Sequence, residues 1–106
     1  MSHVTTHILD ATAGVPAADV TVRLSGPDGA TLAEGRTDAD GRLALGPDVL
    51  DPGDHALTFA TGAYFAARGV DTFYPTVTIA FTVGERPHDH VPLLLSPFGY
   101  STYRGS

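Results

Sequence analysis

Short apolar runs alternate with polar positions along the whole chain, and glycine, proline and aspartate separate one run from the next. The runs are rich in Val, Thr, Leu, Ile, Phe and Tyr and recur about every eight to twelve residues, which is typical of an antiparallel sandwich. The pattern predicts strands at about 3–10, 19–25, 30–37, 42–45, 54–61, 75–84, 89–96 and 99–104. We therefore expect an all-β fold, a two-sheet β-sandwich of about eight strands.

Turn sequences fall between the predicted strands, with glycine or proline where a tight turn favours them. They are AGVP (13–16), GPDG (26–29), DADG (38–41), DPGD (51–54) and SPFG (96–99). Segment 20–37 predicts a hairpin with Val20, Val22 and Leu24 on one face. The segment GAYFAARG (62–69) has helix-forming residues without a period of two, so we expect one short helix there.

Two of the predicted strands have a second face that mixes histidine with apolar residues. In the first strand, Val4, Thr6 and Ile8 share one face, and the other face holds His3, Thr5, His7 and Leu9. In the strand at 89–96, Val91, Leu93 and Leu95 share one face, and the other holds His88, His90, Pro92, Leu94 and Ser96. Leucine and histidine on one face indicate a surface that a partner subunit covers.

Composition narrows the class of protein without identifying it. The 106 residues suit a single domain, residues 1–106, and no apolar run approaches the ~20 residues of a membrane span. The net charge of −6, with no cluster of arginines, argues against nucleic acid as a partner. The chain shows neither a secretory signal at its start nor a peroxisomal signal at its end, so we expect a cytoplasmic protein.

The available side-chain chemistry is limited, because cysteine, lysine, asparagine and glutamine are all absent. Disulfides, thiol nucleophiles and Schiff-base lysines are therefore excluded. The DADG turn looks like the opening of a calcium loop, but the RLALGPD that follows lacks the further oxygen ligands and the closing glutamate. We favour a plain hairpin turn that places Arg42 at the start of a short strand.

His88 and His90 are two residues apart, so their side chains point to the same side of a strand. A third histidine from the first strand, His3 or His7, would complete a three-histidine zinc site. Without a metal, the same residues would supply neutral imidazoles that activate water and move protons near pH 7. The spacing leaves both possibilities open, together with histidines that are simply solvated.

The chain ends in YSTYRGS (100–106), which carries two tyrosines and an arginine close to the terminal carboxylate. Composition alone favours a solvated tail or an edge strand that ends there. The segment also brings a guanidinium, a phenol, a hydroxyl and a carboxylate to one place, and these groups suit a flat polar ligand.

Four segments, in this order, resemble the transthyretin-like family and, within it, the 5-hydroxyisourate hydrolases. They are TTHILDATAGVPAADVTVRL (5–24), EGRTDADGRL (34–43), LTFATGAYFAARGVDTFYPTVTIAFTV (57–83) and HVPLLLSPFGYSTYRGS (90–106). The resemblance runs from Val4 to Ser106. The final Tyr-Arg-Gly-Ser is similar to the hydrolases and not to the hormone carrier that shares their fold.

The resemblance implies a transthyretin-like sandwich with one short helix, a homotetramer with sites in the channel between dimers, and neither cofactor nor metal. The implied catalytic residues are His7, Arg42, His90 and Ser106. The implied substrate-binding residues are His7, Arg42, Tyr103, Arg104, Gly105 and Ser106. Asp89 stands where the family often has an aromatic residue, so we expect different packing there, and we treat His3 and His88 as peripheral.

The implied reaction is the opening of the six-membered ring of 5-hydroxyisourate by water at a cyclic amide, which follows urate oxidation on the route to allantoin. The product would be 2-oxo-4-hydroxy-4-carboxy-5-ureidoimidazoline. Arg42 and Arg104 would anchor the planar substrate, and His7 and His90 would divide the base and acid roles, with His7 favoured as the base. Ser106 would orient water or substrate and would not act as a nucleophile.

Three alternatives stand beside this hypothesis. One is a transthyretin-like protein that binds a small aromatic ligand without catalysis. Another is a zinc hydrolase that uses His7, His88 and His90. The last is a structural or adhesion sandwich, which explains none of the four segments.

Overall fold

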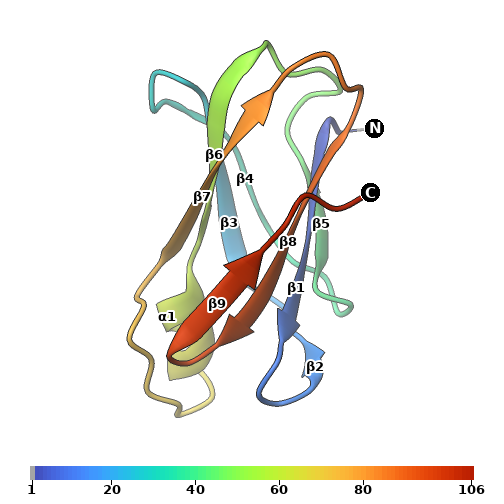
Figure 1. Ribbon diagram of the computed structural model, residues 1–106. Helices are drawn as coiled ribbons and strands as arrows, with labels where there is room; N and C mark the ends of the chain where they lie inside the picture. Colours follow the sequence, from blue (N-terminus) through green and yellow to red (C-terminus); the bar gives the residue numbers. More distant parts are fainter. Residues whose placement is uncertain (1) are drawn as a thin grey trace.

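The computed structural model describes residues 2–106, which form two facing β-sheets with one short helix at one end of the sandwich (Figure 1). In chain order the elements are β1 (Val4–Asp10), β2 (Val15–Pro16), β3 (Thr21–Ser25), β4 (Thr31–Arg36), β5 (Arg42–Leu45), β6 (Gly53–Phe59), α1 (Thr61–Ala66), β7 (Val77–Val83), β8 (Asp89–Ser96) and β9 (Gly99–Thr102). No helix within these residues is long and apolar enough to cross a membrane.

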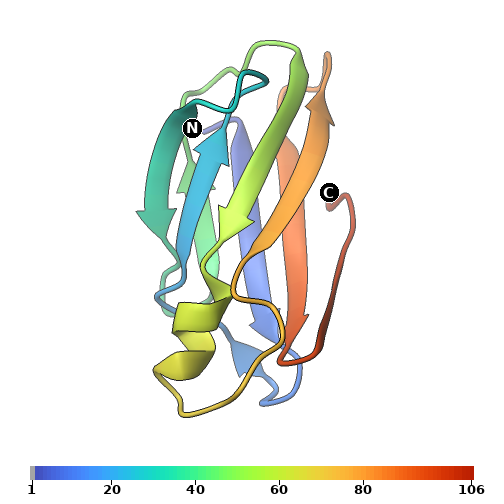
Figure 2. The same cartoon turned by 90° about the vertical axis from the view of Figure 1, so that its left-hand side faces the viewer.

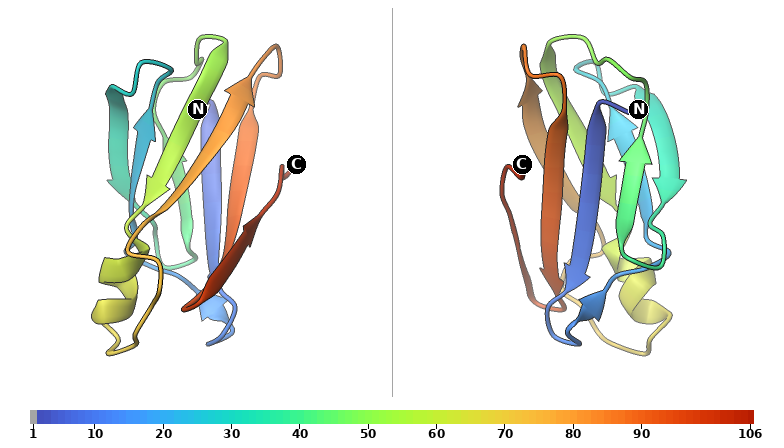
Figure 3. Two further views of the ribbon diagram at one scale, coloured as in Figure 1. Left: turned by 60° about the vertical axis from the view of Figure 1, so that its left-hand side comes forward. Right: turned by 90° about the vertical axis from the view of Figure 1, so that its right-hand side faces the viewer.

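The first sheet is built around β1. One side of β1 pairs in parallel with β8, and the other side pairs antiparallel with β5 and, near the end of the strand, with β2. β9 pairs antiparallel with the far side of β8. The right-hand view of Figure 3 shows β5, β1 and β8 side by side, with the end of the chain beyond β8.

The second sheet has the order β4-β3-β6-β7, and all its pairs are antiparallel. Figure 2 shows this sheet in front, with α1 packed at the end where β6 finishes. The β3–β4 hairpin is as predicted, and Val20, Val22 and Leu24 are buried.

Strand alternation determines which side chains form the core between the sheets. In β1 the residues from Val4 to Asp10 alternate strictly between buried and half-buried. The largest fully buried side chains come from both sheets and from α1; they are Phe59, Phe65, Ile8, Leu24, Leu57, Leu93 and Leu95. Full burial of such a side chain contributes about 1.5–3 kcal/mol. A register slip of one residue would move this whole set outward, so the core also fixes which residues face away from it.

The predicted sandwich is confirmed, and the predicted strands differ from the observed ones by at most two residues at either end. The sequence did not predict β2, because its two residues belong to AGVP, which has the composition of a turn. In the structure these two residues also pair with the end of β1. The predicted strand 54–61 ends at Phe59, since Thr61 begins the helix. The helix itself ends at Ala66 and not at 69, where Gly69 adopts a φ of 67° that terminates helices.

Candidate active site

The outer face of the first sheet carries three of the residues predicted to be catalytic, His7, Arg42 and His90. In the β1–β5 register His7 lies opposite Arg42, and in the β1–β8 register Thr5 lies opposite His90. His7 and His90 are therefore diagonal neighbours on adjacent strands, within reach of each other's long side chains. The alternation predicted for β1 and β8 thus places His7, Arg42 and His90 on one face.

The DADG turn fixes where Arg42 enters β5. The carboxylate of Asp38 accepts hydrogen bonds from the backbone N–H groups of Asp40 and Arg42, both at 2.9 Å. Gly41 has a φ of 75°, and its carbonyl accepts the N–H of Ile8 at 2.8 Å. A Cβ at Gly41 would collide with the carbonyl oxygen of Ile8, so the turn lies directly against β1. The DADG turn is present as predicted, but it joins β4 of one sheet to β5 of the other. The prediction that it closes a hairpin is therefore wrong.

The last residues of the chain lie against the start of β8. Gly105 donates its backbone N–H to the carbonyl oxygen of His90 at 2.9 Å, which forms an isolated antiparallel bridge. A Cβ at Gly105 would collide with the imidazole of His90 and press on the ring of Pro92. Glycine is therefore required here for close approach and not for an unusual φ.

A hollow of about 540 Å³ lies on this face. Its lining residues are Thr5, Thr6, Arg36, Asp38, Arg42, Leu43, Ala44, His88, His90 and Ser106. The structure thus brings Arg42, His90 and Ser106 into one concave site. His7 does not line the hollow, although it lies next to Arg42 in the sheet.

Tyr103 and Arg104 occupy a different place. They line a second hollow of about 360 Å³ between the end of the chain and β7, together with Phe81 and Arg86. Tyr103 is 59% exposed. His90 lines both of these hollows, and a smaller one of about 250 Å³ is lined by Arg104, Gly105 and Ser106 together with His88. Within one chain, the predicted substrate-binding residues therefore lie around His90, although Tyr103 and Arg104 do not share the hollow that holds Arg42.

His90 is the best-defined acid–base group in the first hollow. Its Nδ1 lies 2.8 Å from the hydroxyl oxygen of Thr5, and its ring stacks on that of His88 with centroids 6.4 Å apart. Burial lowers the pKa of His90, and the positive charge on His88 lowers it further, while a hydrogen bond to the backbone of Thr5 acts in the opposite direction. Arg42 and His7 also lower this pKa. The neutral imidazole, which accepts a proton, is thereby favoured near pH 7.

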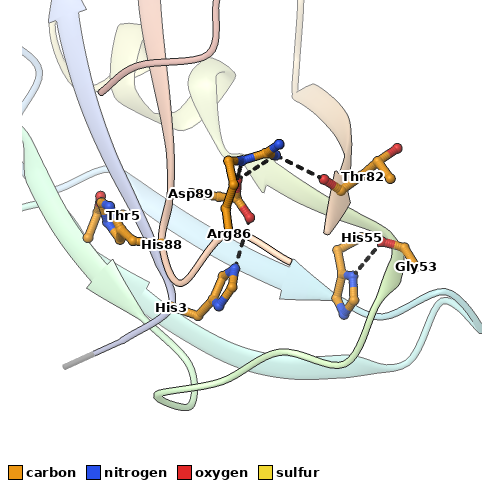
Figure 4. Close-up of polar contacts among 8 residues, drawn as sticks. All are labelled: His3, Thr5, Gly53, His55, Thr82, Arg86, His88 and Asp89. Carbon is orange, nitrogen blue, oxygen red and sulfur yellow. Dashed lines mark hydrogen bonds and ion pairs between the residues drawn. The ribbon is translucent and has the colours of Figure 1, made fainter. Parts of the chain in front are cut away.

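His88 and Thr5 also line this hollow, although the sequence indicates a peripheral place for His88 and no role for Thr5. Nε2 of His88 lies 2.8 Å from the same Thr5 hydroxyl, and Figure 4 shows the two side chains together. The strand pattern did place Thr5, His7, His88 and His90 on shared faces. What it lacked was the β1–β8 register, which sets Thr5 opposite His90.

His3 does not lie on the outer face, so that part of the strand prediction is wrong. The strand begins only at Val4, and the His3 side chain is 3% exposed. Its Nε2 donates to the Asp89 carboxylate at 2.8 Å, and Arg86 binds the other oxygen of that carboxylate (Figure 4). Burial acts to raise the pKa of Asp89, but the hydrogen bonds from His3 and Arg86 outweigh it and the pKa is lowered. At Asp89, where we expected packing different from that of the family, the structure has a buried carboxylate bound by His3 and Arg86.

The donor geometry gives no support to the zinc alternative. Within residues 2–106, no three His, Asp or Glu side chains are arranged to hold a metal ion. His88 and His90 each direct one ring nitrogen at the Thr5 hydroxyl.

Comparison with known proteins places this geometry in a family. A model of the HIUase/Transthyretin family matches residues 4–105. The 5-hydroxyisourate hydrolase of Caulobacter vibrioides is 53% identical over 116 aligned residues, which cover 100% of both chains. The structure of Klebsiella pneumoniae 5-hydroxyisourate hydrolase superposes with a TM-score of 0.90 at 44% identity, covering 99% of this chain and 100% of that one. Transthyretin from Sparus aurata also has a TM-score of 0.90, at 31% identity and with 99% and 97% coverage.

Proposed function

We propose that this chain, which belongs to the HIUase/Transthyretin family, is a hydrolase that opens the ring of 5-hydroxyisourate. The fold does not separate a hydrolase from a carrier, because both kinds of structure superpose equally well. The observation that carries the proposal is the hollow in which Arg42, His90 and Ser106 meet. A carrier has no need to combine a guanidinium, a neutral imidazole and the polar Ser106 around one small volume.

Arg42 is the proposed anchor for the substrate. Its guanidinium offers a rigid set of donors that matches adjacent carbonyl oxygens or a delocalised anion. It also lies where it can stabilise the oxyanion that forms when water attacks a ring carbonyl. The turn at Asp38 and Gly41 holds the backbone of Arg42 in place, so the anchor is positioned before substrate arrives.

His90 is the proposed general base. Thr5 engages its Nδ1, which leaves Nε2 to take a proton from the attacking water. One O–H bond of water then breaks, its oxygen bonds to the carbonyl carbon, the C–N bond of the ring opens, and the ring nitrogen gains a proton. His7, beside Arg42, is the proposed donor of that proton. The sequence favoured His7 as the base; the hollow and the lowered pKa of His90 favour the reverse assignment.

Ser106 is proposed to orient substrate or water with its hydroxyl or its carboxylate. Tyr103 and Arg104 line the other hollow, which His90 also lines, so in our proposal they reach a substrate held at Arg42 only through assembly or a shift of the last residues. We also propose that the reaction follows urate oxidation in purine breakdown, that it uses no metal, and that it takes place in the cytoplasm.

A homotetramer is proposed because the outer face that carries the site is partly apolar. Leu94 lies on this face and is 37% exposed, and Leu9 pairs with it across β1 and β8. A second pair of subunits packed here would cover both leucines and enclose the hollow. Light scattering on the purified proteins tests this. The parent protein should have the mass of a tetramer, and Leu94→Arg should have the mass of a smaller assembly. A parent protein that is monomeric would refute the proposal.

The activity itself is tested by adding the purified protein to urate and urate oxidase. The absorbance of 5-hydroxyisourate should decay faster than it does spontaneously, and the acceleration should persist in a strong chelator. Spontaneous decay combined with tight binding of an aromatic ligand would instead identify a carrier. Activity that the chelator abolishes would identify a metal enzyme.

A further inference from the structure

We propose that the hydroxyl of Thr5 is a positioning group that connects His90 to the exposed His88 and carries one proton from the site to solvent in each turnover. The inference rests on the proposed hydrolysis. It assigns a role to two residues that lie outside the set of His7, Arg42, His90 and the last four residues.

The three groups form one continuous chain of hydrogen bonds. The hydroxyl oxygen of Thr5 is 2.8 Å from Nδ1 of His90 and 2.8 Å from Nε2 of His88. Thr5 and His90 are directly paired in the parallel β1–β8 ladder, so the backbone holds this contact. His90 and Thr5 are half-buried, whereas His88 is exposed. The chain therefore runs from the hollow to solvent.

Counting donors restricts the protonation states of this chain. A hydroxyl has one proton to donate and two lone pairs that accept. Only one of the two facing ring nitrogens can therefore receive the Thr5 proton, and the other must carry a proton of its own. If His90 carries a proton on Nδ1, Thr5 donates to His88, and Nε2 of His90 is free to act as the base. The hydroxyl thus links the tautomers of the two rings.

Ring opening releases a proton that has to leave the site. A neutral cyclic amide plus water gives a carboxylate, a ureido nitrogen too weakly basic to retain a proton, and one free proton at neutral pH. In the proposed path, Nε2 of His90 takes a proton from water, and the Nδ1–H bond of His90 breaks as its proton moves to the Thr5 oxygen. The original Thr5 proton moves to Nε2 of His88, and His88 then releases its Nδ1 proton to solvent. One proton enters the chain and one leaves it, and the carboxylic acid formed on ring opening returns a proton to His7. Both imidazoles then hold the other tautomer, and proton exchange with water after the product leaves restores the Nδ1–H bonds of His90 and His88.

The charges around His90 favour outward transfer. His88 faces it from the segment before β8, His7 from β1 and Arg42 from β5, and Ser106 lines the same hollow. Arg36 and Asp38 line the hollow beyond Arg42. Arg42 and His7 both lower the pKa of His90 and so disfavour its protonated form. Transfer of the extra proton from His90 toward solvent moves positive charge away from Arg42 and His7.

The principal test removes the hydroxyl without changing the shape of the side chain. Thr5→Val should lower kcat about tenfold to a hundredfold with KM little changed, which is less than the full value of general base catalysis. Thr5→Ser keeps the hydroxyl and should restore most of kcat. Thr78→Val removes a comparable strand hydroxyl from the second sheet, where it hydrogen-bonds with the hydroxyl of Thr58, and should have parent activity.

His88→Asn and the double variant test whether the two residues act as one path. His88→Asn alone should also lower kcat, and Thr5→Val with His88→Asn should be no slower than the slower single variant, because a broken path cannot be broken twice. The solvent deuterium isotope effect should be largest in the parent protein, where several protons move together, and smaller in Thr5→Val.

Nitrogen NMR of the imidazoles provides a readout that requires no activity. Thr5→Val should change the protonation pattern of both His88 and His90, while Thr78→Val should leave it unchanged. If the parent enzyme is active and Thr5→Val retains its kcat, isotope effect and imidazole signals, the relay is refuted. If the parent protein shows no activity on 5-hydroxyisourate, the proposed function fails, and the NMR comparison still decides whether Thr5 links the two rings.

Discussion

The backbone N–H of Gly105 donates to the carbonyl oxygen of His90 at 2.9 Å, and the imidazole of His90 fills the space that a side chain at position 105 would need. The end of the chain is thus packed on the proposed base. Ser106 follows directly and lines the hollow that contains His90.

Gly105→Ala should therefore displace the chain end from β8 and lower kcat/KM, because either Ser106 or the His90 ring must move. Gly99→Ala is the matched control: its Cβ would meet nothing closer than the Ser96 hydroxyl at 3.9 Å. We expect Gly99→Ala to retain parent kinetics and Gly105→Ala to lose about tenfold or more, since small misplacements at an active site are costly. Equal rates for both variants would show that the Gly105 contact does not position the site.

His90→Asn should lower kcat about a hundredfold to ten-thousandfold, the usual contribution of general base catalysis. Asparagine can keep a hydrogen bond to Thr5 but cannot take a proton from water. Circular dichroism and the urea midpoint should remain close to those of the parent, because the His90 ring lies outside the core. His7→Asn should also reduce turnover; full activity in either variant would remove that residue from the proposed mechanism.

The pH dependence of kcat/KM follows from the lowered pKa of His90. The neutral imidazole of His90 is the form that acts as the base, so the rate should fall as the pH drops through this pKa. Because the pKa is lowered, the midpoint of the acid limb should lie below about 6.5, the value of an unperturbed histidine. His88→Asn removes one charge that lowers the pKa, so its midpoint should move upward. A midpoint at or above 6.5 in the parent enzyme would contradict the assignment.

Gly41→Ala should destabilise the protein and impair substrate binding together. The new Cβ would collide with the Ile8 carbonyl oxygen while the residue holds a positive φ. Gly29→Ala is the control, since its φ of 83° is equally unfavourable but a Cβ there would meet nothing within 4 Å. Urea unfolding should show a loss of about 1–2 kcal/mol for Gly29→Ala, from the left-handed conformation alone. We expect a clearly larger loss for Gly41→Ala, with a raised KM because Arg42 moves.

Asp89→Asn should lower the free energy of unfolding by about 1–3 kcal/mol at pH 7, because His3 and Arg86 lose a buried charged acceptor. The pKa of Asp89 is lower in the folded state than its ordinary value of 3.8. Its stabilisation is therefore complete above the unfolded pKa and disappears as the pH falls through the folded pKa. Urea unfolding of both proteins should give a difference that is constant from pH 5 to 7 and shrinks below about pH 4. A difference that grows in acid would contradict this sign.

Much of the fold follows from local pattern. Period-two alternation places Val4, Thr6 and Ile8 inward and Thr5, His7 and Leu9 outward, and the structure has them so. His3 breaks this rule because it precedes the strand, where the alternation no longer applies. The pairing of Val15 and Pro16 with the end of β1 was not predictable, since a turn sequence does not reveal that two of its residues also reach a neighbouring strand.

The sequence by itself determined the sandwich, its faces and the residue types available for chemistry, because these depend on side-chain period and composition. The tertiary structure alone decided which of them meet. The parallel register of β1 and β8 sets Thr5 between His88 and His90, and the bridge from Gly105 brings Ser106 to Arg42 while Tyr103 and Arg104 turn toward β7. Contacts between residues more than 80 positions apart depend on strand order and register, and no local pattern encodes these.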